Sequence, residues 1–97
     1  MIRHTVAFTL KHAKGSPGET AFLNDAKVLA AIPGVTRFEQ LRQTSKKTDF
    51  AFGFSMEFAN AAAYAAYNDH PVHTAFVQDR WIQEVAAFME IDYEPLD

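Results

Sequence analysis

The chain opens on a strict alternation of residues between two faces. Over residues 2–10, IRHTVAFTL, every second side chain is apolar apart from one histidine, and together they form one face: Ile2, His4, Val6, Phe8 and Leu10. A period of two with β-branched and aromatic residues predicts a β-strand with one buried face. A second alternation, FAFGFSMEF over 50–58, sets large apolar groups against small or polar ones and predicts the strongest strand.

Capping residues between these strands predict the first helix. Ser16 suits the N-cap, Pro17 suits the first helical position, and Glu19 completes a capping box. The helix is expected to run to about Ile32, where Pro33-Gly34 ends it. A weaker strand over residues 35–43 and a polar turn over 44–49 complete the first half.

A broken helix and a last strand follow. The alanine-rich segment 61–67 predicts a helix, but Pro71 disfavours helical geometry at His70 and opens a second helical segment. That segment is expected to continue to about Phe88. Residues 87–95 then predict the final strand.

The predicted order is β-α-β-β-α-β in a single domain spanning residues 1–97. This is the ferredoxin-like α+β pattern, an antiparallel sheet with helices on one face. The aromatic face of 50–58 should meet the helices. The opposite face carries Gly53 and Ser55, and in a monomer it would be bare. A second copy of the sheet is the simplest cover, which predicts a symmetric homodimer.

Composition narrows the classes of function. A chain of 97 residues fits one small domain. Net charge is −3 and no basic patch is present, so we expect no nucleic-acid partner. There is no cysteine, which excludes thiolate metal sites. No apolar run is long enough for a membrane helix and no signal peptide is visible, so we expect a cytoplasmic protein without a membrane partner.

The densest chemistry lies in YNDHPVHTAF, residues 67–76. His70 and His73 have a spacing that would suit a metal pair on one helix, but Pro71 places them on different segments. His70 and Pro71 are therefore interpreted as structural residues at the helix break. His73, in the first turn of the new segment, could act as a general base near neutral pH or could be an ordinary helix residue.

Other polar residues carry weaker signals. His4 belongs to the buried face of the first strand, and Tyr67 ends the alanine-rich helix. Taken alone, each fits a packing role. Glu90 and Asp92 alternate with apolar Met89, Ile91 and Tyr93, and this parity favours acids that point away from the helices, with a pocket-facing carboxylate as the alternative. No phosphate loop or nucleophile motif is present.

Three segments together resemble a known family. IRHTVAFTLK, GFSMEFANAAAYAAYNDHPVHTAFV and IDYEP are similar to the stress-responsive A/B barrel (Dabb) proteins, and Tyr67-x-x-His70-Pro71-x-His73-x-x-Phe76 is the most specific part. The resemblance covers almost the whole chain. It implies a ferredoxin-like protomer that pairs sheet to sheet into a dimeric α+β barrel.

The resemblance also implies a site. In the plant polyketide cyclase of this family that makes olivetolic acid, the matching residues act on a substrate held between sheet and helices. The catalytic roles would fall on His73 as base, on Tyr67 in substrate orientation, and on His4. Pocket-lining roles would fall on four bulky residues: Phe8, Phe22, Phe54 and Met56.

Two further expectations follow from the resemblance. Some plant members hold a magnesium ion on backbone carbonyls near the end of the first helix, which would correspond to Leu29, Ile32 and Val35. No other cofactor is expected. The function implied is cofactor-free acid/base chemistry (cyclase, isomerase or aldol-type lyase) on a small, largely apolar carbonyl compound. A non-catalytic, ligand-binding or stress-response dimer is the alternative. A monooxygenase of the related cofactor-free barrel type, or a haem-degrading one, is a third reading.

Overall fold

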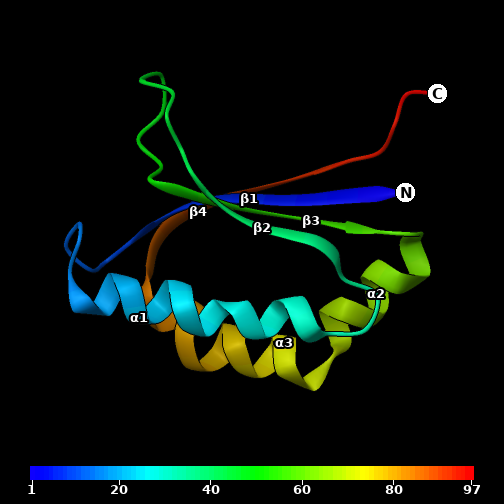
Figure 1. Cartoon of the computed structure of the whole chain (residues 1–97), viewed down its shortest axis with the longest axis horizontal. Helices are drawn as coiled ribbons and strands as arrows, with labels where there is room; N and C mark the ends of the chain where they lie inside the picture. Colours follow the sequence, from blue (N-terminus) through cyan, green and yellow to red (C-terminus); the bar gives the residue numbers. More distant parts are fainter.

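A computed structural model describes all residues 1–97 and shows four strands with helices on one face (Figure 1). In chain order the elements are β1 (Ile2–Leu10), α1 (Pro17–Asp25), the 3-10 helix η1 (Ala26–Ala31), β2 (Thr36–Arg42), β3 (Phe52–Phe58), α2 (Ala61–Asp69), α3 (Pro71–Phe76), the π-helical η2 (Val77–Trp81), α4 (Ile82–Glu84) and β4 (Val85–Tyr93). The sheet order is β2-β3-β1-β4 and each pairing is antiparallel. The predicted ferredoxin-like fold is confirmed.

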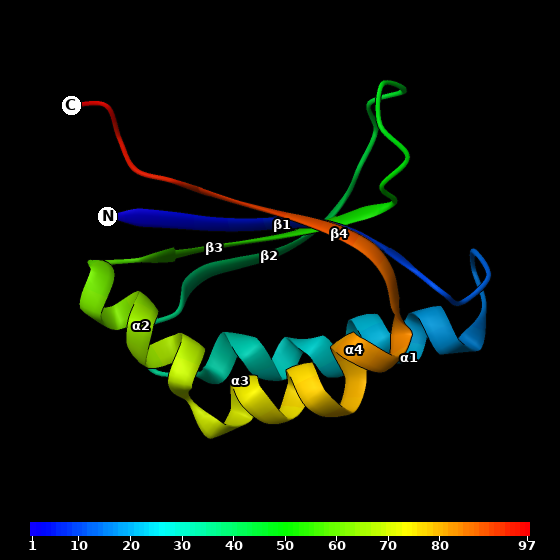
Figure 2. The same ribbon diagram turned by 180° about the vertical axis from the view of Figure 1, so that it is seen from behind.

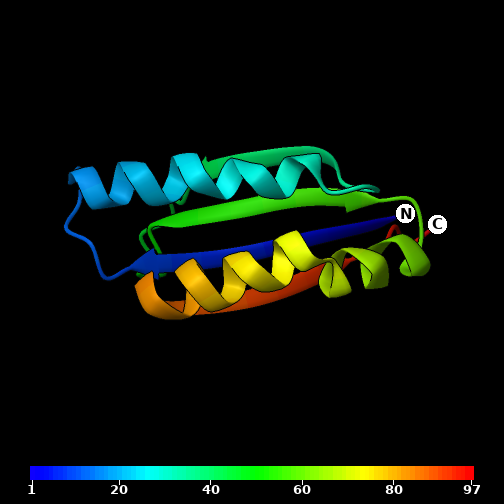
Figure 3. The ribbon, with the colours of Figure 1, turned by 90° about the horizontal axis from the view of Figure 1, so that it is seen from below.

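The helices form two rows across the sheet. Seen from the helical side, α1 and η1 run along β2 and β3, while α2 and the helical segment from α3 to α4 run along β1 and β4 (Figure 3). The caps explain where each row begins. Ser16 accepts the Glu19 N–H at 3.3 Å, and Asn60 accepts the Ala63 N–H at 2.9 Å. Glu19 reaches back to the N–H of Gly15, one residue before the position that a capping box predicts.

Some boundaries differ from the sequence prediction. The last helix ends at Glu84, not near Phe88, and β4 begins at Val85. The reason is tertiary: the Glu84 carbonyl accepts the Lys11 N–H at 2.8 Å, and Val85 then pairs with Leu10 at the end of β1. Pairing with β1 therefore places residues 85–88 in a strand, although their local pattern also suits a helix.

The core lies between the sheet and both helical rows. Alternate residues of β1 and β3 fill it, and its largest fully buried side chains are Tyr67, Phe8, Phe22, Phe58 and Met56. Phe8 meets Phe54 edge-on at 4.7 Å between ring centroids, and Phe22 packs on Phe76 from the other helical row at 5.5 Å. These aromatic contacts join sheet and helices into one core.

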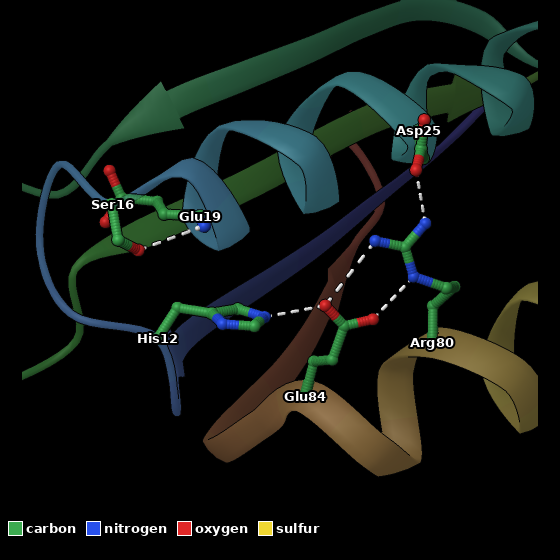
Figure 4. A network of polar contacts seen from close by, with 6 residues as sticks. All are labelled: His12, Ser16, Glu19, Asp25, Arg80 and Glu84. Atoms are coloured by element: carbon green, nitrogen blue, oxygen red, sulfur yellow. Dashed lines mark hydrogen bonds and ion pairs between the residues drawn. The ribbon is translucent and has the colours of Figure 1, made fainter.

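A polar network ties the two helical rows to the end of β1. Figure 4 shows Arg80 bonded to Asp25 of α1 and to Glu84, while His12 Nε2 lies 2.6 Å from Glu84 Oε1. The hydrogen bonds from Arg80 are the main reason that the pKa of the Glu84 carboxyl lies below its ordinary value. Because Glu84 also ends the helix, this network fixes the corner from which β4 enters the sheet.

The other face of the sheet has no helical cover (Figure 2). Ala7 pairs with Met89 and Thr5 with Ile91, and opposite residues in an antiparallel pair share a face. Met89, Ile91 and Tyr93 are 52%, 42% and 55% exposed. The β2–β3 connection and the C-terminal segment both extend on this side (Figure 1). None of the helices has the length and apolar character needed to span a bilayer.

Candidate functional site

A cavity of about 290 Å³ lies between the sheet and the helical segment from α2 to α4. Ten of its 14 lining residues are hydrophobic. Its volume is at the small end of ligand sites, so it suits a compact molecule. Ile82, Phe88 and Glu90 line the cavity yet are exposed, which marks the opening between α4 and β4.

His73 enters the cavity from the first turns of α3. Its Nδ1 lies 3.0 Å from the carbonyl oxygen of Asn68. A carbonyl only accepts, so Nδ1 carries the proton and Nε2 keeps a free lone pair. Burial lowers the pKa of His73 below 6.5, while the bond to Asn68 acts in the opposite direction. The side chain is therefore a neutral imidazole at pH 7 with an available acceptor.

Tyr67 lies directly beside His73. The two ring centroids are 4.5 Å apart, and the ring of His4 lies 6.1 Å from that of Tyr67. Tyr67 is 2% exposed, its hydroxyl has no hydrogen-bond partner in the protein, and no buried polar side-chain atom is left unpaired. The hydroxyl is therefore accessible from the cavity. Burial, and to a smaller extent the charge of Glu90, raises the pKa of Tyr67, so the hydroxyl stays a donor.

His4 is held by a carboxylate and a second tyrosine. Its Nδ1 lies 2.6 Å from Asp92 Oδ1, and the Tyr64 hydroxyl lies 2.9 Å from the same Nδ1 and 2.7 Å from Asp92 Oδ2. A carboxylate accepts from both groups, so His4 donates to Asp92 through Nδ1 and its Nε2 has no protein partner. His4 and His73 both donate to the protein through Nδ1, and Tyr67 supplies a hydroxyl donor to the site.

The position of the two acids corrects the sequence analysis. Asp92 pairs with His4 and Glu90 with Val6, so both carboxylates share the face of β1 that meets the helices. Parity assigned them to the opposite face because Met89, Ile91 and Tyr93 are the more apolar set. The apolar set instead occupies the uncovered face, while Glu90 lines the cavity and Asp92 lies beside His4.

The residues at the helix break have structural contacts. His70 is the N-cap of α3, and its Nδ1 accepts the Val72 N–H at 3.1 Å. Pro71 follows at the first helical position, where its missing N–H leaves no bond unmade. His70 is not among the cavity residues, so the break sends the two histidines to different environments.

The four pocket-lining candidates divide into two pairs. Phe54 and Met56, from β3, line the cavity. Phe8 and Phe22 do not line it, and both belong to the buried aromatic core. A further part of the wall comes from η2 and includes Val77 and Trp81, which the sequence analysis did not assign to the pocket.

Two groups of residues are candidate metal positions. The Leu29 carbonyl accepts the Ile32 N–H, and the Ile32 carbonyl accepts the Val35 N–H, so each of these two carbonyl oxygens keeps one lone pair for an ion. A different trio, His4, Glu90 and Asp92, offers ligand atoms within 4.8 Å of one another. There the Tyr64 hydroxyl bonds to all three and takes the central place.

The sequence analysis did not include Tyr64 and Asp92 in the site. Tyr64 precedes Tyr67 by three residues, so both fall on one helix face, and that spacing was the available signal. Asp92 could be placed only through the register of β4 against β1.

The comparisons with known proteins agree with this architecture. A Mesorhizobium loti Dabb-family protein with a ferredoxin-like fold is 67% identical, with 99% of this chain and 97% of that one covered and a TM-score of 0.98. A dimeric ferredoxin-like protein from Thermobifida fusca is 20% identical (97% and 90% covered, TM-score 0.76). Hydroxynitrile lyase from Passiflora edulis is 12% identical (95% and 90% covered, TM-score 0.78). At these low identities the last two show the fold alone.

No curated protein sequence matches the chain. The family model for the Stress responsive A/B Barrel Domain matches residues 2–95, which is nearly the whole chain. With this match and the close Mesorhizobium loti relative, the chain belongs to the stress-responsive A/B barrel (Dabb) family.

Proposed function

We propose that this protein catalyses cofactor-free acid/base chemistry on a small carbonyl compound, beginning with removal of a proton from the carbon next to the carbonyl. The observation that carries the proposal is the pairing of His73 and Tyr67. His73 has a free acceptor nitrogen and Tyr67 a free donor hydroxyl. Their ring centroids lie 4.5 Å apart in an apolar cavity. Such a cavity with a few convergent polar groups is the usual form of a small-molecule site.

The roles follow from the hydrogen bonds. His73 Nε2 takes the proton, and the electron pair of the C–H bond moves to the carbonyl oxygen as an enolate. The Tyr67 hydroxyl donates to that oxygen and stabilises its charge. His4 donates to Asp92 through Nδ1, so its Nε2 is free for a hydrogen bond to the substrate.

The enolate is common to cyclisation, isomerisation and aldol-type cleavage, so its formation is the step to test. The purified protein would be incubated in deuterium oxide with a panel of β-dicarbonyl compounds and small ketones, and exchange at the α-carbon followed by NMR. We expect exchange above the buffer rate, and its loss in His73→Gln. Asp69→Asn, a change at an exposed residue at the end of α2, is the matched control. Equal exchange in the wild type and His73→Gln would remove His73 from the mechanism.

The cavity also supports the alternative function. A dimer that binds a small hydrophobic ligand without chemistry needs the same apolar wall. In that case the histidines would only order the helix break and line the pocket. The open space beside Tyr67 and His73 fits both functions, whereas a space filled by side chains would have counted against catalysis. Ligand binding without α-carbon exchange for any compound of the panel would support the alternative.

We also propose that the protein is a homodimer through the uncovered sheet face. Met89, Ile91 and Tyr93 form an exposed apolar row there, opposite the small residues of β1 and β3. Small central residues let a second sheet approach closely, and an exposed row of large apolar groups favours burial. The Thermobifida fusca relative described as dimeric shares this fold.

A further inference from the structure

The wall of the cavity has one formal charge, and it is negative. Glu90 is the only charged residue among the 14 that line the cavity, and neither lysine nor arginine is present. The other polar groups are the two histidines, Asn68 and the hydroxyl of Tyr67. Asp92 adds a second carboxylate behind His4. The electrostatic potential at the opening is therefore negative.

Glu90 has no counter-ion. The arginines near the sheet are engaged elsewhere, Arg3 with Glu57 and Arg80 with Asp25 and Glu84. The single hydrogen bond to Glu90 comes from the Tyr64 hydroxyl at 3.3 Å, and that hydroxyl lies closer to Asp92, at 2.7 Å. One oxygen of Glu90 consequently has no donor in the protein, at an exposed position on the cavity opening.

The charge of Glu90 extends into the cavity. It contributes, after burial, to the raised pKa of Tyr67, and it opposes the lowering of the pKa of His73. A second negative group brought into the same apolar space would be both desolvated and repelled. A positive group at the opening of the cavity would form an ion pair with the unpaired carboxylate of Glu90.

We infer that the cavity selects molecules with an apolar body and an ammonium or similar cationic head, with the head at Glu90, and that it rejects carboxylates of the same shape. This selectivity gives the substrate class for the proposed function. Only the conversion of the bound molecule rests on that function; its binding does not. The carbonyl end would lie at Tyr67 and His73, and the body against Phe54, Met56 and Trp81. Specificity arises from repulsion of anions as much as from attraction of cations.

Binding of three matched probes tests the inference without any turnover. The probes are 2-phenylethylamine, 2-phenylethanol and phenylacetate, which share a ring and differ in charge. Trp81 is the only tryptophan and lines the cavity, so its fluorescence reports occupancy. At pH 7.5 and low salt we expect the amine to bind about tenfold more tightly than the carboxylate, with the alcohol between them.

Glu90→Gln keeps the shape of the side chain and removes its charge. We expect the amine and the carboxylate to bind this variant within about twofold of one another, since little charge then distinguishes them. Asp79→Asn, on the exposed side of η2, is the matched control and should keep the wild-type order. A wild type that binds phenylacetate as well as the amine, an unchanged order in Glu90→Gln, or no binding of any probe would each overturn the inference. If the order holds while α-carbon exchange is absent, the proposed catalysis fails and this selectivity stands.

Discussion

The Nδ1 atom of His4 lies 2.6 Å from Oδ1 of Asp92, although 88 positions separate them in the sequence. The contact exists because β1 and β4 are neighbours and these two residues are directly opposite. His4 is 7% exposed, so without Asp92 its Nδ1 proton would lack a strong acceptor in a largely dry setting.

Asp92→Asn tests this relationship. The amide oxygen can replace one acceptor but not both, so the bonds from His4 and Tyr64 compete for it. We expect a loss of about 1–2 kcal/mol in the free energy of unfolding, measured by urea denaturation. Asp97→Asn, on the exposed C-terminus, is the control. An unchanged midpoint would show that Asp92 does not hold His4 in solution.

The two tyrosines of α2 should respond differently to loss of the hydroxyl. Tyr67→Phe removes a group that has no protein partner, so we expect stability within about 0.5 kcal/mol of the wild type, with a large loss of α-carbon exchange. Tyr64→Phe removes the donor to Asp92 and should cost about 1 kcal/mol. Thermal unfolding together with the exchange assay separates the two. Comparable destabilisation by both variants would contradict the open Tyr67 hydroxyl.

The pH dependence of activity should report His73. Because burial lowers its pKa below 6.5, the base is neutral at pH 7, and exchange should fall only at more acidic pH. The stability effect has the same direction. The unfolded chain takes up the proton near pH 6.5 and the folded protein only below that, so stability from this residue is present above pH 6.5 and is lost as pH falls through the folded pKa. NMR titration of the His73 ring would measure the midpoint directly, and a value above 6.5 would refute the assignment.

The uncovered sheet face should control assembly. Ile91→Asp places a charge in the centre of the exposed apolar row of β4, and we expect it to convert the proposed dimer to monomer in sedimentation experiments. Val28→Asp changes an exposed apolar residue on the helical side and should leave the dimer intact. A wild-type protein that sediments as a monomer at micromolar concentration would contradict the proposal before any variant is made.

Local signals in the sequence were enough for the order of elements. The alternation in residues 2–10, the Ser16 cap, the alanine-rich segment 61–67 and the break at Pro71 each depend on a few neighbouring residues, so they can be recognised in the sequence alone. They predicted a strand, two helix starts and separate environments for His70 and His73. The end of the last helix was wrong because strand pairing with Leu10, a distant partner, decides it.

The sequence by itself determined that a ferredoxin-like domain would form with a histidine on the helical face of β1, because periodicity and capping are local. Only the tertiary structure decided which face of β4 meets the cavity. Alternation along a strand leaves two choices for the face that turns inward. The usual criterion, that the more apolar face is buried, fails here because the outer face of β4 is itself apolar. The register of β1 against β4 resolves it, and in doing so brings Asp92 to His4 and the unpaired charge of Glu90 to the opening of the cavity.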